Sequence, residues 1–457
     1  MGFGLHGWGV GAVNWLIKHG AKVTVTDLKN REQLKSTLSR INEKKVKLIL
    51  GRHREIDFKN TDIVLQNPGV PHESKFIKIA KKFGAMIEND ASLFIKNCSG
   101  TVIGVTGTRG KSTTSVLMHE FLKSKKVFLA GLPQLPLLDI LDKVKKNGLA
   151  ILELSSWQLE ILGQQMISPP VAVIINIYPD HLNRYSGLAE YIEAKANIIR
   201  FQGANDIGVV NLDNSATKKL GEKVGGRRYW FSLKYFAEQN GSFVKSGNIY
   251  FRENGNVERV CPVKALKLAG EHNLENALAA ITVAKVFGAK SSTIKKVLKN
   301  FRGLPFRIEV VRQFNGIQYI NDTTSTTPDA TMAALKTLGA KKRKSENGKI
   351  VLIAGGTTKN IPDEKFKQLA GLIKQNCKAL ILFKGDGSRQ ILRHLKKIKY
   401  QPVVFEIGSM AGAVALANSF AQKRDIVLLS PACASFNMFI NEYDRGEQFN
   451  RIVNKIN

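Results

Sequence analysis

A glycine-rich segment at residues 107–113 combines the residue types that handle phosphates. It reads Gly-Thr-Arg-Gly-Lys-Ser-Thr, follows the apolar run 102–106 and precedes a helical pattern. In such a loop, backbone N–H groups and the positive end of the helix dipole attract phosphate oxygens. Lys111 would reach the β- and γ-phosphates of a nucleotide, and the Ser112 hydroxyl would ligate Mg²⁺. The spacing departs from the strict G-x4-G-K-[ST] pattern because Val105 replaces the first glycine, but strand, loop, lysine, hydroxyl and helix coincide.

Acidic and histidine side chains at two further apolar runs could complete a metal or substrate site. Glu153 lies in the run 149–154, and Asp180 and His181 follow the run 171–178. The carboxyl ends of parallel strands share one sheet edge, where ligands bind, and Mg²⁺ prefers oxygen ligands. Glu153 is therefore a candidate metal ligand, with helix capping as the alternative. His181 is either a metal or substrate contact or a structural histidine.

A second glycine pattern, GxGxxG, opens the sequence at Gly2–Gly7, and Asp27 ends the apolar run 22–26 twenty residues later. This combination is typical of a nucleotide-binding crevice. The strand that should precede the loop is missing, since only Met1 stands before it. Either the start of the sequence is late or the domain lacks its central strand, and we favour the late start.

Parallel sheets covered by helices would position these residues. A strand–helix rhythm recurs in three successive segments, which predicts an α/β fold of three domains. We expect a Rossmann-like N-terminal domain at 1–97, a central P-loop ATPase domain at 98–302 and a Rossmann-like C-terminal domain at 303–457. A period of two between residues 227 and 263, with a hairpin turn at Asn254-Gly255, adds a small antiparallel sheet to the central domain.

The individual elements follow from apolar periodicity. Strands are expected at 22–26, 62–65, 102–106, 149–154, 171–178, 317–321, 350–354, 379–383, 403–407 and 426–429, and a strongly periodic helix at 273–287.

The composition is that of a globular protein, with 457 residues, 43% hydrophobic and 23% charged. No apolar run approaches the ~18 residues that cross a bilayer, and no secretory signal or cysteine framework is present. We expect a cytoplasmic monomer with no membrane partner. The net charge of +32 makes nucleic acid a candidate partner, but the lysines are spread along the whole chain, so we expect no nucleic-acid partner.

The whole set of motifs resembles the Mur ligases, ATP-dependent amino-acid ligases of peptidoglycan precursor synthesis that are related to folylpolyglutamate synthetase. Within that family it looks most like the members that add D-glutamate to UDP-N-acetylmuramoyl-L-alanine. The matching pieces run in order along essentially the whole chain. They are Thr106–Ser112, Glu153–Glu160, Asp180–Tyr185, Lys195, His272-Asn273 with Asn276, Leu304–Arg307, Ser430–Phe436 and Arg445-Gly446.

The resemblance implies a role for each matched position. For catalysis it implies Lys111, Glu153, His181 and Lys195. For ATP it implies Gly107, Thr108, Gly110, Lys111, Ser112, Thr113, Asn273, Asn276, Arg307 and Asp322. For the UDP-substrate it implies Leu5, His6, Asp27, Lys29, Ser155, Gln158 and His181, and for D-glutamate Thr326, Lys359, Ser435 and Phe436. For metal it implies Ser112, Glu153, His181 and Lys195.

Lys195 takes its role from the resemblance alone. By itself, a lysine in the helical stretch 191–196 would be a solvated surface residue. The family's equivalent is carbamylated by CO₂, so the expected cofactors are ATP, Mg²⁺ and a carbamylated Lys195.

Some positions depart from the family pattern. Thr324 stands where a lysine is common, Leu132 where an asparagine is common, and Glu442 where an aromatic residue is common, with Tyr443 following. These departures affect the fine substrate contacts and not the class of reaction.

Three rival interpretations remain open. GxGxxG with Asp27 also fits a nicotinamide dehydrogenase, although it leaves the lysine-bearing loop unexplained. Another Mur ligase or a folylpolyglutamate-synthetase-like ligase would share the ATP site. A basic P-loop nucleic-acid-binding protein is the non-ligase alternative.

Overall fold

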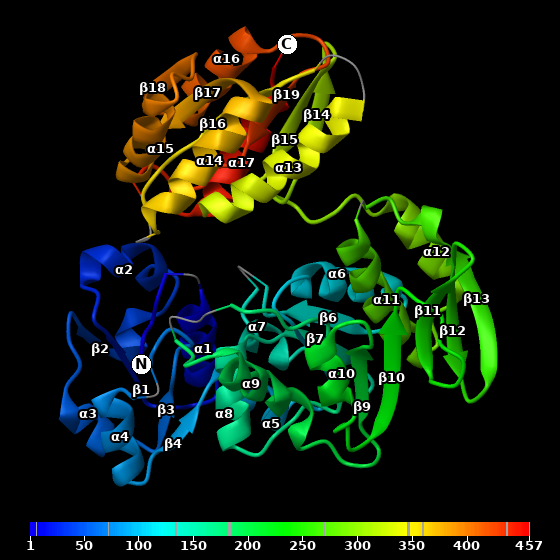
Figure 1. Ribbon diagram of the computed structural model, residues 1–457. Helices are drawn as coiled ribbons and strands as arrows, with labels where there is room; N and C mark the ends of the chain where they lie inside the picture. Colours follow the sequence, from blue (N-terminus) through cyan, green and yellow to red (C-terminus); the bar gives the residue numbers. More distant parts are fainter. Residues whose placement is uncertain are drawn as a thin grey trace. The chain divides into compact units, whose positions relative to one another are not determined.

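The computed structural model describes residues 1–5, 7–71, 73–132, 135–180, 184–268, 270–344, 348–358, 361–435 and 437–456, without the side chains of 340–344 and 405. The chain forms two compact units, Met1–Phe301 and Arg302–Asn457 (Figure 1). Parallel strands alternate with helices in both units, so the predicted α/β class is confirmed.

The first part of the first unit carries four short strands in two separate parallel pairs. Its elements are α1 (Trp8–Lys18), β1 (Val23–Asp27), α2 (Arg31–Leu38), η1 (Glu43–Lys45), β2 (Val46–Leu50), α3 (Glu55–Lys59), β3 (Ile63–Leu65), α4 (Lys75–Lys82), β4 (Met86–Glu88) and α5 (Asp90–Asn97). β1 pairs with β2, and β3 pairs with β4. No strand in the described residues joins the two pairs.

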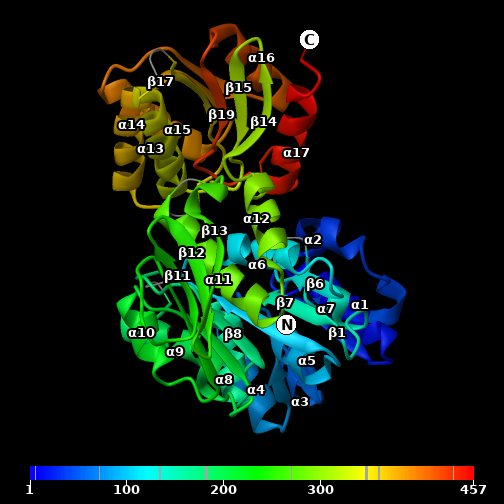
Figure 2. The same cartoon turned by 90° about the vertical axis from the view of Figure 1, so that its right-hand side faces the viewer.

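The rest of the first unit is built on one nine-stranded sheet in the order β13-β12-β11-β10-β9-β8-β5-β7-β6. Figure 2 shows β11, β12 and β13 side by side in it. Its strands are β5 (Thr101–Thr106), β6 (Val127–Ala130), β7 (Leu149–Glu153), β8 (Val171–Ile174), β9 (Ile207–Asn211), β10 (Arg227–Ser232), β11 (Gly241–Lys245), β12 (Asn248–Glu253) and β13 (Asn256–Pro262). Its helices are α6 (Lys111–Phe121), α7 (Leu138–Leu141), α8 (Ser156–Gln164), α9 (Leu188–Arg200), α10 (Ser215–Gly221), η2 (Val263–Ala265), α11 (Glu271–Val286) and α12 (Ser291–Asn300).

The antiparallel part begins later than expected and continues the main sheet. β10 pairs in parallel with β9 and with β11, and only β11, β12 and β13 alternate in direction. The predicted turn at Asn254-Gly255 does join β12 to β13, where Glu253 faces Asn256. The period of two in the sequence therefore indicated strands with one exposed face. It did not indicate whether those strands pair in parallel or antiparallel.

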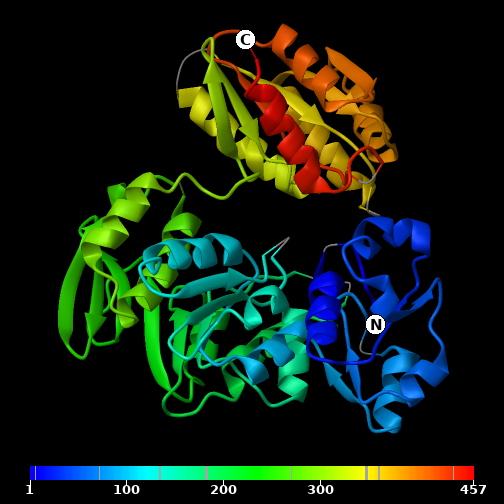
Figure 3. The same ribbon diagram turned by 180° about the vertical axis from the view of Figure 1, so that it is seen from behind.

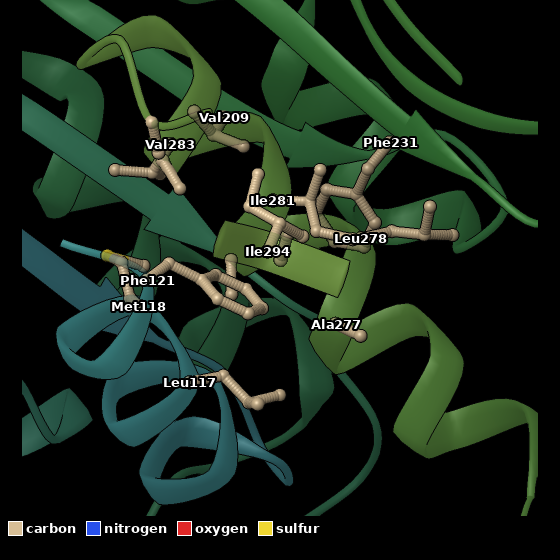
Figure 4. Packing of buried hydrophobic residues seen from close by; sticks show 14 of the residues in the cluster. Leu117, Met118, Phe121, Val209, Phe231, Ala277, Leu278, Ile281, Val283 and Ile294 are labelled. Carbon is tan, nitrogen blue, oxygen red and sulfur yellow. The ribbon is translucent and has the colours of Figure 1, made fainter. Parts of the chain in front are cut away.

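Two hydrophobic clusters cover opposite faces of this sheet. On one face, α6, α11 and α12 contribute Leu117, Phe121, Ile281 and Ile294, all essentially inaccessible to solvent (Figure 4). Burying a side chain of this size contributes about 1.5–3 kcal/mol. The other face is covered mainly by α7, α8 and α9. Because that second cluster also contains Phe94 of α5, the two parts of the first unit share a core.

The second unit is a doubly wound sheet in the order β14-β15-β19-β16-β17-β18. Its elements are β14 (Glu309–Phe314), β15 (Ile317–Asn321), α13 (Pro328–Lys344), β16 (Ile350–Ala354), α14 (Asp363–Asn376), β17 (Cys377–Phe383), α15 (Asp386–Lys397), β18 (Val403–Ile407), α16 (Met410–Phe420), β19 (Ile426–Leu429) and α17 (Glu442–Val453). Helices α13–α15 pack on one face, and α16 and α17 pack on the other (Figure 3). Among the described strands of this sheet, only β14 is antiparallel to its neighbour.

The strand expected at 171–178 is shorter in the structure and ends at Ile174. Ile175 still donates its N–H to the Thr106 carbonyl, but the next backbone carbonyl, of Asn176, accepts from Thr108 N at 2.9 Å. The chain therefore leaves the sheet to contact the glycine-rich loop.

The search for membrane-spanning helices, made over the residues that the structure describes, found none of sufficient length and apolarity.

Candidate nucleotide and metal site

The glycine-rich loop joins the end of β5 to the start of α6 and makes Lys111 the first residue of that helix. Gly110, just before it, has φ 88°, a left-handed conformation that glycine adopts without strain. A Cβ atom on Gly110 would lie 2.1 Å from the Asn276 Oδ1 atom of α11, so Asn276 packs directly against the loop. Lys111 Nζ donates to the Gly107 carbonyl at 3.0 Å.

Asn176, just after β8, fixes the glycine-rich loop. Its carbonyl accepts from Thr108 N at 2.9 Å. Its side-chain Oδ1 accepts from Arg109 N at 2.9 Å, and its Nδ2 donates to the Arg109 carbonyl at 3.1 Å. Sequence reasoning gave Asn176 no role, although its position as the first polar residue after an apolar run could have indicated one. These bonds hold the loop in a fixed shape before any ligand arrives.

Ser112 and Glu153 form the part of this site that suits a metal ion. Ser112 Oγ donates to Glu153 Oε2 at 2.8 Å, and both side chains are half-buried. Two neighbouring ligands of one octahedral Mg²⁺, each at ~2.1 Å, are roughly 3 Å apart, so this oxygen pair fits the ion. No group of three or more His, Cys, Asp or Glu gathers among the described residues, and His181 lies outside them.

Lys195 of α9 is buried, with 1% of its surface exposed. The prediction that a lysine in this helix would be a solvated surface residue is therefore wrong. Its Nζ donates to the Gly107 carbonyl at 3.2 Å and to Thr106 Oγ1 at 3.3 Å. Burial lowers the pKa of Lys195 well below its ordinary value, and the nearby Lys111 ammonium lowers it further. Two lysine side chains thus converge on one carbonyl of the loop.

In the first part of the chain, Asp27 holds the other glycine loop. Its carboxylate accepts from Gly4 N at 2.9 Å and from Lys29 N at 2.8 Å, and the side chain is buried. Leu5 is half-buried beside this loop, and His6 lies outside the described residues. The carboxylate therefore shapes the loop through backbone bonds.

Ser155 and Gln158 form a capping box at the start of α8. Gln158 Oε1 accepts from Ser155 N at 3.0 Å, and Gln158 Nε2 donates to Asp90 Oδ1 at 2.9 Å. Burial raises the pKa of Asp90. This network connects α8 of the nine-stranded part to α5.

In the second unit, Asp322 joins three segments. Its Oδ2 accepts from Ser325 Oγ at 2.6 Å and from Ser430 Oγ at 2.7 Å, while its Oδ1 accepts from Ile308 N at 3.2 Å. Burial raises the pKa of Asp322. Thr324, the departure from the family lysine, donates its hydroxyl to the Phe306 carbonyl at 2.9 Å.

Ser435 is the candidate D-glutamate residue that the structure describes most clearly. Its side chain is 1% exposed, and its Oγ has no hydrogen-bond partner among the described residues. A buried hydroxyl without a partner is costly, and a bound ligand would relieve that cost. Thr326 and Arg307 also lie in this unit, half-buried and exposed respectively, whereas Lys359 and Phe436 are outside the described residues.

Arg445 of α17 makes structural contacts that the sequence did not predict. The guanidinium is completely buried and donates to the Thr323 carbonyl at 3.0 Å and to the Cys433 carbonyl at 3.2 Å. Burial lowers its pKa to about 10. Arg445 thereby joins the loop after β15 to the loop after β19, which carries Ser435.

The structure brings Lys111, Ser112, Glu153, Lys195 and Asn276 together at the carboxyl edge of the nine-stranded sheet. Thr113 follows in the first turn of α6, and Asn273 lies one turn before Asn276 in α11. The fold is α/β, and this loop is a candidate phosphate-binding site.

Comparisons with known proteins identify the family to which the chain belongs. Three family models match in succession: the Mur ligase MurD-like N-terminal domain at residues 1–88, the Mur ligase middle domain at 105–284 and the Mur ligase glutamate ligase domain at 306–433. The UDP-N-acetylmuramoylalanine--D-glutamate ligase of Roseiflexus sp. (strain RS-1) is 36% identical over 99% of this chain and 97% of its own. That of Borreliella afzelii (strain PKo) is 35% identical over 100% and 97%. The chain belongs to the Mur ligase family.

Solved structures share the fold. The UDP-N-acetylmuramate-alanine ligase MurC of Thermotoga maritima aligns with a TM-score of 0.62 and 21% identity, covering 99% of this chain and 98% of its own. MurF of the same organism, solved in complex with ADP, aligns with a TM-score of 0.54 and 20% identity, covering 87% and 99%. The three-domain Mur architecture predicted from the sequence is thus confirmed at the level of fold.

Proposed function

We propose that this protein is an ATP-dependent ligase that adds D-glutamate to UDP-N-acetylmuramoyl-L-alanine in peptidoglycan precursor synthesis. The observation that carries the proposal is the convergence of Lys111 and Lys195 on the Gly107 carbonyl, beside the Ser112–Glu153 pair. The names of the curated relatives, at 32–36% identity over nearly the whole chain, supply the substrates.

The reaction has two steps. The carboxylate of the UDP-substrate attacks the γ-phosphorus of ATP, so ADP leaves and an acyl phosphate forms. The D-glutamate amine then attacks the acyl carbon, phosphate leaves, and the amine loses a proton as the amide forms. Lys111 and the backbone N–H groups of the loop orient the phosphates and stabilise their charge.

Ser112, Glu153 and the carbamylated Lys195 are the described residues that would hold Mg²⁺, with His181 as a further ligand. The ion, when bound, neutralises charge on the β- and γ-phosphates. The 2.8 Å separation of the Ser112 and Glu153 oxygens supports this assignment.

We propose that Lys195 is carbamylated. The neutral Nζ bonds to the carbon of CO₂ and releases one proton, which turns an amine into a carboxylate. Burial and the Lys111 charge both lower the pKa of Lys195, so they favour the neutral amine that this step needs. A carboxylate beside Lys111 is also better placed electrostatically than a second ammonium.

The carbamate has a direct test. Lys195→Ala should lose most activity, and added formate or acetate should restore part of it by supplying a carboxylate in the vacated space. Wild-type activity should rise with bicarbonate. A Lys195→Ala enzyme as active as wild type, or one inactive and unresponsive to any small carboxylate, would remove the carbamate from the mechanism.

The remaining residues are assigned to three ligands. Leu5, His6, Asp27, Lys29, Ser155, Gln158 and His181 would form the UDP-substrate site. Gly107, Thr108, Gly110, Thr113, Asn273, Asn276, Arg307 and Asp322 would contact ATP. Thr326, Lys359, Ser435 and Phe436 would contact D-glutamate. The Ser435 hydroxyl, which has no hydrogen-bond partner within the described part of the chain, supports that pocket. With Thr324 in place of lysine, we expect the glutamate carboxylates to depend on hydroxyls and on Lys359.

The organisation of the chain is part of the proposal. We assign residues 1–97 to UDP-substrate binding, 98–302 to ATP and 303–457 to the amino acid. We also propose that the enzyme works as a cytoplasmic monomer without nucleic-acid or membrane partners.

One assay tests the activity and its rivals. Phosphate release from ATP should require both UDP-N-acetylmuramoyl-L-alanine and D-glutamate, and L-glutamate should not replace D-glutamate. Release with a different amino acid or acceptor would instead indicate a sister ligase of the Mur or folylpolyglutamate type. Salt-sensitive binding to DNA or RNA without such release would indicate a nucleic-acid-binding protein, and NAD-dependent hydride transfer a dehydrogenase.

A further inference from the structure

Glu160, Arg184 and Tyr185 lie in the matched pieces of the chain but in none of the three ligand sites. Glu160 belongs to α8, and the other two lie between β8 and α9. The side chains of Arg184 and Glu160 are only 20% and 15% exposed, and Tyr185 is buried. Charged side chains are seldom withdrawn from water to this extent unless they are paired. Their burial therefore indicates a pairing that the fold maintains.

Arg184 connects α8 to a distant turn of the chain. Its Nη2 donates to Glu160 Oε2 at 3.0 Å, and its Nη1 donates to the Pro68 carbonyl at 3.3 Å. The guanidinium also lies over the Trp157 ring, with 4.9 Å between its Cζ and the ring centroid. A planar guanidinium can stack and donate in two directions at once, which a lysine ammonium cannot. The three contacts together fix the orientation of Arg184.

The turn that contains Pro68 lies against the glycine loop of the first part of the chain. The turn is closed by Val70 N, which donates to the Asn67 carbonyl at 2.9 Å. A Cβ atom on Gly4 would lie 3.4 Å from Asn67 Nδ2. The guanidinium therefore bonds to a turn that borders the proposed UDP-substrate site.

Glu160 continues the network on the other side of Arg184. Its Oε1 accepts from the Tyr185 hydroxyl at 2.5 Å. Burial raises the pKa of Tyr185, and the hydrogen bond to Glu160 raises it further, so this hydroxyl keeps its proton and donates. One carboxylate thus receives a guanidinium on one oxygen and a phenol on the other.

The tyrosine connects the network to α9, the helix beside α8 (Figure 1). The ring centroids of Tyr185 and Tyr191 are 5.3 Å apart. The Tyr191 hydroxyl shares a hydrogen bond of 3.3 Å with Thr108 Oγ1 in the glycine-rich loop. Lys195 Nζ lies 4.8 Å from the centroid of the Tyr191 ring. Contacts therefore run without a break from the Pro68 turn to the glycine-rich loop and Lys195.

We propose that Arg184 and Glu160 are positioning residues, which hold the Pro68 turn in register with the glycine-rich loop. The UDP-substrate bound beside the turn then presents its carboxylate to the γ-phosphate held by the loop. Neither residue touches the reacting atoms, because each acts through the turn or through the tyrosine pair. This inference rests on the proposed ligase function, which it extends by two residues.

Steady-state phosphate release by full-length variants tests the positioning role. Arg184→Gln loses the bonds and the stacking, so the KM for UDP-N-acetylmuramoyl-L-alanine should rise about tenfold. The KM for ATP should stay as in wild type, because Asn176 holds the glycine-rich loop independently. Arg184→Lys keeps the charge and can reach one acceptor, so it should recover part of the loss. A merely structural role would instead disturb both KM values together.

A double-mutant cycle tests whether the two residues act as one unit. The Arg184→Gln, Glu160→Gln double variant should raise the KM for the UDP-substrate no more than Arg184→Gln alone. Arg200 of α9, which pairs with Glu193 on the surface, gives the matched control, since Arg200→Gln should leave both KM values unchanged. Additive effects of the two substitutions, or an unchanged KM for the UDP-substrate in Arg184→Gln, would overturn the proposal.

Amide exchange without ligands separates this inference from the proposed function. The Val70 amide should exchange faster in Arg184→Gln than in wild type or Arg200→Gln, because the turn loses its bond to the guanidinium. Unchanged exchange would overturn the proposal whatever the activity. A wild-type protein that releases no phosphate with UDP-N-acetylmuramoyl-L-alanine and D-glutamate would reject the ligase function. Faster Val70 exchange in Arg184→Gln would then still support control of the turn by Arg184.

Discussion

Lys111 is the first residue of α6 and its ammonium lies against the glycine-rich loop, where we propose that it binds phosphate. Replacing it with Ala should lower phosphate release by a factor of 10² to 10³, equivalent to ~2.7–4 kcal/mol of lost transition-state stabilisation. The fold should persist, because the side chain is only half-buried. Turnover is measured alongside thermal unfolding.

Lys123, just beyond α6, provides the matched control for Lys111. It is exposed and pairs with Glu120 at 3.3 Å, and such surface pairs contribute little. Lys123→Ala should therefore keep wild-type turnover. Near-normal phosphate release by a folded Lys111→Ala protein would contradict the assigned role.

Lys195 should lower stability in the unmodified protein, because its amine is buried against the neutral oxygens of Thr106 and Gly107. Between the lowered pKa of the folded state and the ordinary 10.5, the unfolded chain holds a proton that the folded chain has lost. Wild-type stability in this window should therefore rise with pH, by up to ~1.4 kcal/mol per unit. Lys195→Met, which removes the ionisable group, should be more stable than wild type near neutral pH, and its advantage should shrink toward pH 10.

Denaturant unfolding in CO₂-free buffer measures this difference at several pH values. The exposed Lys218 of α10 gives the control, since Lys218→Met should change stability little at any of them. A Lys195→Met protein less stable than wild type at every pH would mean that the amine is stabilised in the fold by interactions stronger than its burial cost.

At the scale of elements, the turn from β5 into α6 depends on Gly110. Replacing Gly110 with Ala should destabilise the fold in two ways. The left-handed φ of 88° costs an L-residue about 1–2 kcal/mol. The new Cβ would also collide with the Asn276 oxygen, which lies 2.1 Å from its position. Gly288, after α11, has φ 76° and open space around its Cβ position. Gly288→Ala should therefore cost only the backbone strain.

The two variants separate strain from collision. Gly110→Ala should lose more stability than Gly288→Ala and should also lose ATP affinity, because the loop or α11 must move. Calorimetric unfolding and ATP titration of both proteins measure this. Equal destabilisation with ATP affinity retained would show that Asn276 rearranges freely.

Elements buried on both faces could be predicted from the sequence because burial leaves a continuous apolar run. The strands β5, β7, β16 and β19 are of this kind, and each lies within two residues of its predicted position. β14 (Glu309–Phe314) was missed because it lies at the edge of its sheet, where the charged residues Glu309 and Arg312 leave no continuous apolar run. The parallel pairing of β10 with β9 and β11 could not be predicted either, since strand direction is set by tertiary pairing.

The candidate site also contains residues that the sequence could predict and residues that it could not. The loop at 107–113 is a local motif, so its residues and its helix were predictable. The burial of Lys195 and Arg445 depends on segments far away in the chain: Lys195 Nζ bonds to Thr106, and Arg445 bonds to Thr323. Sequence spacing carries no record of such contacts, and only the family resemblance gave Lys195 a role.

The net charge of +32 acts at the scale of the whole molecule. The proposed substrates, ATP, a UDP-sugar and glutamate, are all anions. A positive field raises their local concentration and is screened over about 8–10 Å at physiological ionic strength. The charge is therefore compatible with the proposed function, but it is spread too widely along the chain to be explained by one site.

The division of the chain into two units predicts how fragments will fold. Both hydrophobic clusters of the second unit draw only on residues between 308 and 456, so they are complete in a fragment of residues 302–457. A fragment of residues 98–301 instead loses Ala12, Ala91 and Phe94 from a cluster that it shares with the preceding segment. Large gaps in a packed core cost several kcal/mol each.

We therefore expect residues 302–457 to fold alone and to unfold in one cooperative transition, followed by circular dichroism and calorimetry. Residues 98–301 should unfold at a lower temperature than the same part within residues 1–301, or should bind a hydrophobic dye. A non-cooperative 302–457 fragment would mean that its cores are completed by contacts from the first unit. A fully stable 98–301 fragment would mean that the shared cluster contributes little, and that the proposed boundary at residue 97 separates folding units as well as functions.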